Sequence, residues 1–405
     1  MIQSKKSLYY LAGMNTIHMG TNYLWISFES YILPLELIIY HENSLFLGLI
    51  AFIGTSFGVF IGLLSGTSSD KYYILWGKRG PYILIGALIA IAAIFINNEI
   101  KITVIGILMG YLIIQISSNI SVGAYQPLFV DILQKDQRGT AAGIDGLFVL
   151  IGSAMGYAIT GYLISSGDEQ YALYGLAMAL LVTALITTYT IKNDDKIQKM
   201  GRGNIFKNFM DIFNLRNRMK NYIYVIIGTF MVFSGIVGLS FFEIYFFKYV
   251  LNYSNPAYYV SVAGIVVLAV SAGSSLLFGF LSDKVGRVEI LVITTVIGAA
   301  GMFLIPEFER FDYFLIFGSM IGISYGIFMS VSKALASDMS PKSDAGKFMA
   351  YYNIATGGAS SISPLIYGLM LYFVNSYALG FKLIFYTAGS FFIIGFILFY
   401  ITLKK

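Results

Sequence analysis

Polar and ionisable side chains recur at helical spacing within the first apolar stretch of this 405-residue sequence. Successive members are separated by three, four, three and four positions, which places them on one face of an α-helix. Ionisable groups inside apolar segments are costly and usually functional, so this face is expected to line a cavity rather than to meet lipid. The stripe consists of Asn15, His18, Asn22, Trp25 and Glu29.

Glu29 is the strongest candidate for a proton carrier. Burial disfavours the charged form of a carboxylate, so this side chain could take up a proton on one side of a membrane and release it on the other. Glu243 has similar neighbours, FEIY in place of FESY, and is expected to face the same cavity. The alternative is that both glutamates are hydrated charges at the rim of the membrane.

Two members of the stripe, His18 and Trp25, each allow a second interpretation. His18 could take part in binding, or it could be a buried histidine bonded to a carbonyl group. The flat face of Trp25 could cover the C–H side of a sugar ring, or the side chain could pack between helices or in an interfacial aromatic belt. Both alternatives stay open at this point.

Asp145 and Lys333 complete the candidate set, because they too lie inside apolar stretches. They could pair with each other, or Lys333 could pair with Asp338, and such a pair is favoured over substrate binding by Lys333. No metal-binding pattern is present. The predicted substrate- and proton-binding residues are Asn15, His18, Asn22, Trp25, Glu29, Glu243, Asp145 and Lys333.

A second group of charged residues recurs where apolar stretches give way to charge. The pattern G-x-x-S-D-K begins at Gly66 and again at Gly279, and aspartates follow the fourth and tenth stretches. An aspartate at a helix end can pair with nearby basic residues or approach the positive N-terminus of another helix. Contacts made in only one conformation bias the protein towards it, so these residues could form a latch; the alternative is a set of solvated loop charges. The predicted gating residues are Gly66, Asp70, Lys71, Gly77, Lys78, Arg79, Pro81, Asp131, Arg138, Gly279, Asp283, Lys284, Gly286, Arg287 and Asp338.

The elements that must position these residues are membrane-spanning helices. Only 12% of the residues are charged and 57% are hydrophobic, whereas a soluble domain has about 25% charged residues. The apolar stretches reach the roughly 20 residues that a membrane helix needs, and the alternation typical of a β-barrel is absent. Twelve spans are expected, at 7–34, 44–66, 81–97, 101–128, 140–165, 171–191, 221–250, 256–281, 288–305, 312–336, 345–374 and 379–402.

Lysine and arginine are distributed unequally across the predicted membrane. Only four of the 26 fall in loops on the side opposite the termini, namely Lys101, Lys248, Arg310 and Lys382. The positive-inside rule therefore predicts a multi-pass protein of the cell membrane with both termini in the cytoplasm. The N-terminal MIQSKKS leads into the first span without a cleavage site, so an uncleaved first helix is expected.

The landmarks of the first half return in the second half. The G-x-x-S-D-K motif, the aspartates Asp131 and Asp338, and the glutamates Glu29 and Glu243 recur at similar offsets. We therefore expect an all-α membrane protein of twelve transmembrane helices, built as two pseudo-symmetric six-helix bundles. The bundles are expected at 1–191 and 221–405, joined by a basic cytoplasmic linker at 192–220.

The repeated motif carries a resemblance to a known family. G-x-x-S-D-K-x-G-R, as in Gly279–Arg287, resembles the loop motif of the major facilitator superfamily. The longer first copy, Asp70–Leu84, and the segment GTNYLW resemble the glycoside–pentoside–hexuronide cation symporters, in particular their sucrose–proton branch. The matching residues are Trp76, Gly77, Lys78, Arg79, Pro81 and Tyr82, while Gly80 replaces a basic residue.

The resemblance implies the major facilitator fold, a gating role for the repeated motif and a sugar or glycoside as the solute. The paired aspartates of the melibiose-type members are missing from SFGVFIGLLSG, so sodium coupling of that type is not expected. The predicted function is alternating-access, proton-coupled symport of a sugar, a glycoside or a similar small polar solute. The alternative is a proton-coupled exporter of amphiphilic compounds.

Other classes of protein fit the sequence less well. An integral-membrane enzyme needs a catalytic cluster, and no zinc motif, phosphate loop or nucleophile elbow is present. A transporter-derived sensor needs a cytosolic domain larger than the linker. We therefore expect no enzymatic activity, no cofactor and no nucleic-acid partner. The expected partners are a small-molecule solute, a coupling proton and the lipid bilayer, with the protein acting as a monomer.

Overall fold

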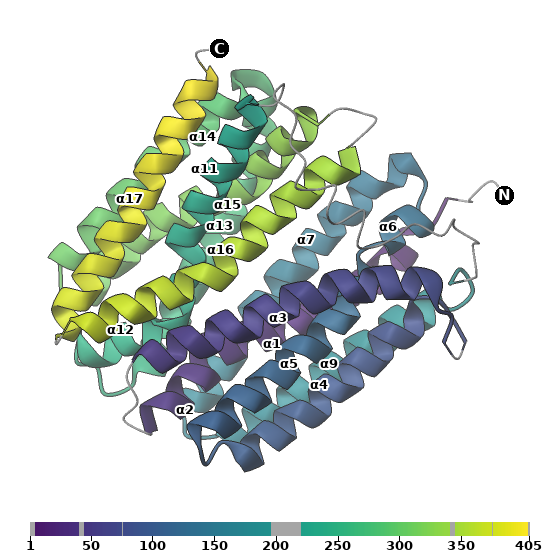
Figure 1. The fold of residues 1–405 in the computed structure, drawn as a ribbon, viewed down its shortest axis with the longest axis horizontal. Helices are drawn as coiled ribbons and strands as arrows, with labels where there is room; N and C mark the ends of the chain where they lie inside the picture. Colours follow the sequence, from purple (N-terminus) through teal and green to yellow (C-terminus); the bar gives the residue numbers. More distant parts are fainter. Residues whose placement is uncertain are drawn as a thin grey trace. The chain divides into compact units, whose positions relative to one another are not determined.

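The computed structural model describes residues 5–39, 44–74, 76–195, 220–340, 345–374 and 376–403. Within these ranges the regular structure is helical, with no β-strand beyond an isolated bridge between Ile74 and Gly77 (Figure 1). The all-α prediction is therefore confirmed for the described part. Most of the predicted linker, 196–219, and the side chain of the gating residue Lys71 lie outside the description.

The chain divides into two compact units. Unit 1 comprises Met1–His41 and Ile53–Gly203, and unit 2 comprises Glu42–Phe52 and Asn204–Lys405. The first turns of α3 (Ser44–Lys71) thus group with unit 2, whereas the rest of that helix groups with unit 1.

The other elements of unit 1 are α1 (Leu8–Ser27), η1 (Phe28–Ile32), α2 (Leu33–Ile39), α4 (Gly80–Ile100), α5 (Val104–Tyr125), α6 (Leu128–Asp131), η2 (Lys135–Gln137), α7 (Arg138–Met155), η3 (Gly156–Thr160), α8 (Gly161–Ser165) and α9 (Glu169–Ile191). Those of unit 2 are α11 (Lys220–Ile236), η4 (Val237–Phe241), α12 (Glu243–Tyr249), α13 (Pro256–Val285), α14 (Arg287–Leu304), η5 (Ile305–Glu307), α15 (Phe311–Asp338), α16 (Ala345–Phe373) and α17 (Tyr377–Leu403).

Eleven helical segments of the described residues are long and apolar enough to cross a membrane. They correspond to the second to twelfth predicted spans, and most of their ends agree with the prediction to within a few residues. The first predicted span is also helical, since α1, η1 and α2 follow one another from Leu8 to Ile39. It is not among the eleven because the amides, imidazole and carboxylate of its polar stripe lower its mean hydropathy.

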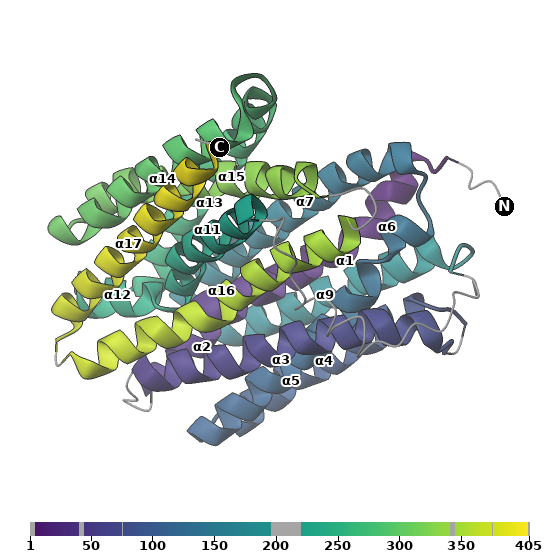
Figure 2. The ribbon, with the colours of Figure 1, turned by 45° about the horizontal axis from the view of Figure 1, so that its top comes forward.

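The same helix pairings recur within the two units. In unit 1, α1 packs against α7 and α9, and α4 packs against α5 and α9. In unit 2, α11 packs against α16 and α17, and α14 packs against α15 and α17 (Figures 1 and 2). By order along the chain α11 corresponds to α1 and α14 to α4, so the packing repeats in the way that the duplicated sequence landmarks predict.

The first helix of each unit departs from α-helical geometry next to a predicted proton site. In unit 1, the π-helical turn Phe28–Ile32 contains Glu29. In unit 2, the 3₁₀ turn Val237–Phe241 ends two residues before Glu243, which begins α12. Single π-helical turns inside α-helices are frequently found at functional sites. Glu29 thus lies within an irregular helical turn and Glu243 follows one, a feature that the sequence around them did not predict.

Candidate functional site

Glu29 is held by two side chains of the neighbouring helix α5. Gln115 Nε2 donates to Glu29 Oε1 at 3.1 Å, and the Tyr111 hydroxyl donates to the same oxygen at 3.3 Å. Gln115 Nε2 also donates to the Tyr111 hydroxyl oxygen at 2.6 Å. Tyr111 and Gln115 are both buried, and Glu29 is half-buried. The three residues form a compact polar cluster, in which the Glu29 carboxylate is held by side chains of its own unit.

Glycines of α3 leave the room that this cluster needs. A Cβ at Gly54 would lie 2.4 Å from Tyr111 Cε1, and a Cβ at Gly58 would lie 2.6 Å from the amide nitrogen of Asn119. Asn119 Nδ2 in turn donates to Gln115 Oε1 at 3.2 Å. Glycine at these two positions therefore allows α3 to approach the polar face of α5.

Gly54→Ala is expected to lower the rate of the predicted transport about tenfold. The added methyl group would displace the buried Tyr111 ring and weaken its bond to Glu29, because overpacking costs about 1–3 kcal/mol and 1.4 kcal/mol corresponds to tenfold in rate. Gly62→Ala on the same helix is the matched control, since its nearest neighbour, Asn119 Oδ1, would lie at an ordinary 3.5 Å. Equal losses of initial uptake rate in the two variants would contradict the role assigned to Tyr111.

A second polar cluster joins α1, α5 and α7. His18 Nδ1 lies 2.7 Å from Asp145 Oδ1, although not in hydrogen-bond geometry. The Tyr125 hydroxyl donates to Asp145 Oδ1 at 2.9 Å and also contacts Asn15 Oδ1. Asn15 Nδ2 donates to the carbonyl oxygens of Leu11 and Ala141 at 2.9 and 3.1 Å. His18 Nδ1 therefore lies beside a carboxylate rather than a carbonyl group, and the two side chains form an ion pair only when the imidazole is protonated.

Trp25 and Asn22 occupy the remaining positions of the α1 stripe. Trp25 Nε1 donates to Ser118 Oγ of α5 at 3.2 Å, and Asn22 Nδ2 donates to the carbonyl oxygen of His18 at 2.8 Å. Both side chains are half-buried. The indole thus packs against α5, and four of the five stripe members contact α5 or α7, whereas the bond of Asn22 stays within α1.

Glu243 lies in a different environment in unit 2. Its Oε2 atom is buried and has no hydrogen-bond partner among the described residues. Such burial is unfavourable for a charge without a partner. Unlike Glu29, Glu243 therefore has no donor prepared to hold its carboxylate.

The expected pair of Lys333 and Asp338 is not formed. Asp338 Oδ2 instead accepts from Arg287 Nε, with an N–O distance of 2.6 Å. The Lys333 side chain is exposed and has no ion pair within the described ranges. This alternative fails because Lys333 lies five residues before Asp338 on α15, whereas side chains meet along a helix at spacings of three or four. The other alternative, a pair of Lys333 with Asp145, stays a prediction.

Arg79 is the centre of the gating cluster in unit 1. Its side chain is 1% exposed, and its guanidinium donates to Asp131 Oδ2 from Nε at 3.0 Å and from Nη2 at 2.9 Å. It also bonds Asp70 Oδ1, Ser69 Oγ and, at 2.8 Å, the carbonyl oxygen of Gly66. Lys78 Nζ lies 3.1 Å from Asp70 and 3.0 Å from Asp131. The two basic side chains are therefore buried and multiply bonded, while Asp70 remains 40% exposed.

Three other gating residues of unit 1 have mainly backbone roles. Pro81 lies in the first turn of α4, where a missing N–H costs nothing. Gly77 pairs through its backbone with Ile74. Arg138 donates to the carbonyl oxygens of Leu133 and Val130 at 3.4 and 3.3 Å rather than to a carboxylate.

The corresponding cluster in unit 2 is smaller and more exposed. Arg287 contacts Asp283 at 3.1 Å and Asp338 at 2.6 Å, but its side chain is 25% exposed and theirs are 61% and 56% exposed. Gly286, with φ +116°, makes the turn between α13 and α14, where other residues would be strained. Lys284 is exposed, and a Cβ at Gly279 would meet Ser330 Oγ at an ordinary contact distance of 3.9 Å.

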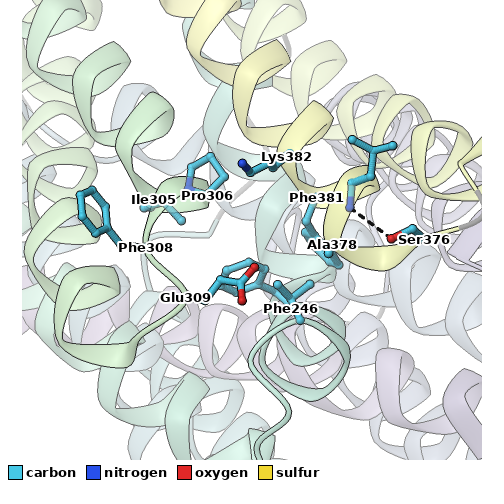
Figure 3. A pocket seen from close by; sticks show the side chains of 11 residues that line it. Phe246, Ile305, Pro306, Phe308, Glu309, Ser376, Ala378, Phe381 and Lys382 are labelled. Carbon is cyan, nitrogen blue, oxygen red and sulfur yellow. Dashed lines mark hydrogen bonds between the residues drawn. The ribbon is translucent and has the colours of Figure 1, made fainter.

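A cavity of about 230 Å³ in unit 2 lies away from all these residues. Figure 3 shows it among the ends of α12, η5 and α17, with aromatic rings and the charged groups of Glu309 and Lys382 around it. None of the predicted site residues lines it. The candidate site therefore rests on the clusters of α1, α5 and α7.

Sequence reasoning missed the contribution of α5. The stretch YLIIQISSNISVGAY contains Tyr111, Gln115, Ser118 and Tyr125, whose spacing places them on one helix face. All four bond members of the α1 stripe. The pattern is present in the sequence, but this face of α5 carries no charged side chain that would mark it.

The chain matches a family model over most of its length. The model described as Major Facilitator Superfamily matches residues 18–274 and again residues 259–405. The two overlapping matches agree with the repeated helix pairings of the two units.

Curated relatives match a shorter part of the chain. The sucrose transport protein SUC4 of Arabidopsis thaliana is 27% identical over 179 residues, which are 40% of this chain and 34% of the relative. Solute carrier family 45 member 4 of Mus musculus is 25% identical over 174 residues, 38% of this chain and 22% of the relative. The matched part thus spans about a third or less of these proteins.

Two solved structures share the fold over nearly the whole chain. The nucleoside transporter NupG has a TM-score of 0.74 at 15% identity, covering 98% of this chain and 99% of that one. A bacterial homologue of the human lysosomal transporter Spinster, inward-facing and unoccupied, has a TM-score of 0.75 at 16% identity, covering 98% of both chains. At these identities the likeness concerns the fold alone.

Proposed function

The chain belongs to the Major Facilitator Superfamily, and we propose that it is a proton-coupled symporter of a sugar, a glycoside or a similar small polar solute. A member of this superfamily is a secondary transporter embedded in a membrane. The solute class and the proton coupling are our proposal. The observation that carries it is the Glu29 carboxylate, held by Gln115 and Tyr111 inside a helix bundle.

The geometry around Glu29 suits a reversible change of protonation. The charged carboxylate accepts from two donors, which partly offset the loss of hydration. A protonated Glu29 becomes a donor itself, and the hydroxyl of Tyr111 and the amide oxygen of Gln115 can then accept. The same three side chains can therefore satisfy both states, and the choice between them changes which groups remain available to a solute.

The polar groups around this cluster fit a polyhydroxylated solute. Asn22, Gln115 and Asn119 supply amides that both donate and accept, as sugar hydroxyls require. Trp25 supplies a flat apolar ring within the same stripe. The names of two relatives, a sucrose transport protein and a nucleoside transporter, point to solutes that contain sugar rings.

The orientation of the protein in the membrane is inferred from the basic residues gathered at one end of unit 1. Lys78 and Arg79 lie at the same end as Lys5, which pairs with Asp136 at 2.7 Å. The two side chains form an exposed hydrogen-bonded pair. The Asp136 carboxylate raises the pKa of Lys5, and the Lys5 ammonium lowers the pKa of Asp136. By the positive-inside rule, we place the gating cluster and both termini in the cytoplasm. We propose a monomer in the cell membrane.

The proposal is tested by uptake into proteoliposomes. We expect a labelled disaccharide, monosaccharide or nucleoside to accumulate when a proton gradient is imposed, and not when a sodium gradient replaces it. Gradient-driven efflux of lipophilic cations, with no uptake of any sugar-containing solute, would instead support the exporter. Uptake that follows sodium and ignores pH would contradict proton coupling.

A further inference from the structure

Asp195 is a buried carboxylate at the point where the chain leaves α9. Its side chain is 5% exposed, and its backbone N–H donates to the carbonyl oxygen of Ile191 at 2.9 Å. It opens the segment that joins unit 1 to unit 2. Its neighbour Asp194 makes an ordinary surface pair with Lys6 at 2.6 Å.

The Asp195 carboxylate binds the start of α4. The backbone N–H of Arg79 donates to its Oδ1 at 2.8 Å and Oδ2 at 2.9 Å, and the N–H of Gly80 donates to Oδ2 at 2.8 Å. The cap residue of α4 makes no side-chain cap bond of its own. The first N–H groups of a helix have no partner within it, and negative charge is favourable there. A carboxylate from the end of α9 therefore serves as the missing cap.

Gly77 leaves the space that this carboxylate occupies. A Cβ at position 77 would lie 2.1 Å from Asp195 Oδ2 and 3.0 Å from Asp195 Cγ. A side chain at this position would thus push the carboxylate away from α4. The contact between Asp195 and the start of α4 therefore requires a glycine at position 77.

Arg79 connects this cap to the gating cluster. Its backbone N–H is held by Asp195, and its guanidinium is held by Asp70 and Asp131. We propose that Asp195 is a positioning residue for transport: by fixing the first backbone amides of α4 it sets where the side chains of Lys78 and Arg79 lie. This inference rests on the proposed transport role of the gating cluster.

Fluorescence tests the positioning without any solute. The chain has two tryptophans, and Trp76 lies beside the cap, 3.7 Å from where a Cβ of Gly80 would be. In a Trp25→Phe background, Asp195→Asn is expected to make Trp76 more accessible to acrylamide, while Asp194→Asn leaves quenching unchanged. Asp195→Glu should restore part of the protection. Unchanged quenching in Asp195→Asn would overturn the inference, whether or not a solute has been found.

Measurements of uptake then distinguish a positioning role of Asp195 from a general effect on the stability of the protein. With Trp25 intact, Asp195→Asn is expected to lower the maximal uptake rate roughly tenfold and to leave the half-saturating solute concentration unchanged. The amide keeps one accepting oxygen, but its NH2 group cannot accept the bond that Gly80 N–H gives to Oδ2. Gly77→Ala should show the same loss, and the double variant should lose little more, because both changes act on one contact. Independent, multiplying losses, or increased quenching with a normal uptake rate, would overturn the proposal. If the wild type transports none of the solutes tested, the proposed function fails while the fluorescence result still stands.

Discussion

Glu29→Gln is expected to abolish accumulation driven by a proton gradient while solute exchange across the membrane continues. Glutamine keeps the size and hydrogen-bonding capacity of a protonated glutamate but cannot release a proton. Gln115 and Tyr111 can still bond the new amide, so the solute site should keep its shape. Gradient-driven uptake should therefore fall at least about 100-fold, the scale on which losing a proton-transfer group acts.

The two halves of this expectation are measured in the same proteoliposomes. Net uptake with an imposed pH gradient reports coupling, and exchange of labelled for unlabelled solute at equal pH reports binding and conformational change. Glu169→Gln is a matched control, because this carboxylate of unit 1 is 48% exposed and, among the described residues, its salt bridge is with Lys101 at the helix ends. Loss of exchange together with uptake would show that Glu29 holds the site together rather than carrying the proton.

The fold could be predicted from the sequence because its signals are local and strong. Twenty-residue apolar stretches indicate helices, and the repeated motif around Gly66 and Gly279 indicates a duplication. The helix ends follow from residues such as Pro81 and Pro256 in first turns and Gly286 between α13 and α14. The π-helical turn at Glu29 could not be predicted, because it depends on how α1 packs within its unit.

The site could be predicted only in part, because the sequence indicates which residues are costly to bury but not which groups meet them. Most members of the stripe from Asn15 to Glu29 do contact other helices of unit 1. Its partners on α5, led by Gln115 and Tyr125, are neutral residues that no charge-based search would select. Asp195 is more distant still, since only the packing of α9 beside α4 brings it to Arg79.

Arg79→Met is expected to destabilise the purified protein by about 3 kcal/mol, because it removes a buried guanidinium that pairs with two carboxylates. Breaking a buried pair from one side costs about 3–5 kcal/mol, since the remaining charge is left uncompensated. The lower end applies here, because Asp131 is 18% exposed, Asp70 is 40% exposed and Lys78 still contacts both. Methionine keeps much of the length of the side chain, so packing changes little. Thermal unfolding in detergent measures the loss.

Arg287→Met is the control, because Arg287 has the corresponding place in the motif of unit 2 but is less buried than Arg79, at 25% against 1% exposed. Its pairs with Asp283 and Asp338 involve carboxylates that are 61% and 56% exposed. Exposed pairs contribute about 0–1 kcal/mol, so a loss of about 0.5 kcal/mol is expected. Equal destabilisation by the two substitutions would refute the view that burial distinguishes the two clusters.

The double variant Arg79→Met with Asp131→Asn identifies the source of the loss. If the cost comes from an uncompensated charge on Asp131, removing that charge should restore stability, so that the double variant is more stable than Arg79→Met alone. If instead the cost comes from the lost bonds of Arg79 to Ser69 and the Gly66 carbonyl oxygen, Asp131→Asn restores nothing. Recovery would mean that the main stabilising role of Arg79 is to compensate the charge of the aspartates, rather than to bond Ser69 and Gly66. In that case the cluster is held together by charge, and it can act as a latch that opens when a competing partner reaches Asp70 or Asp131.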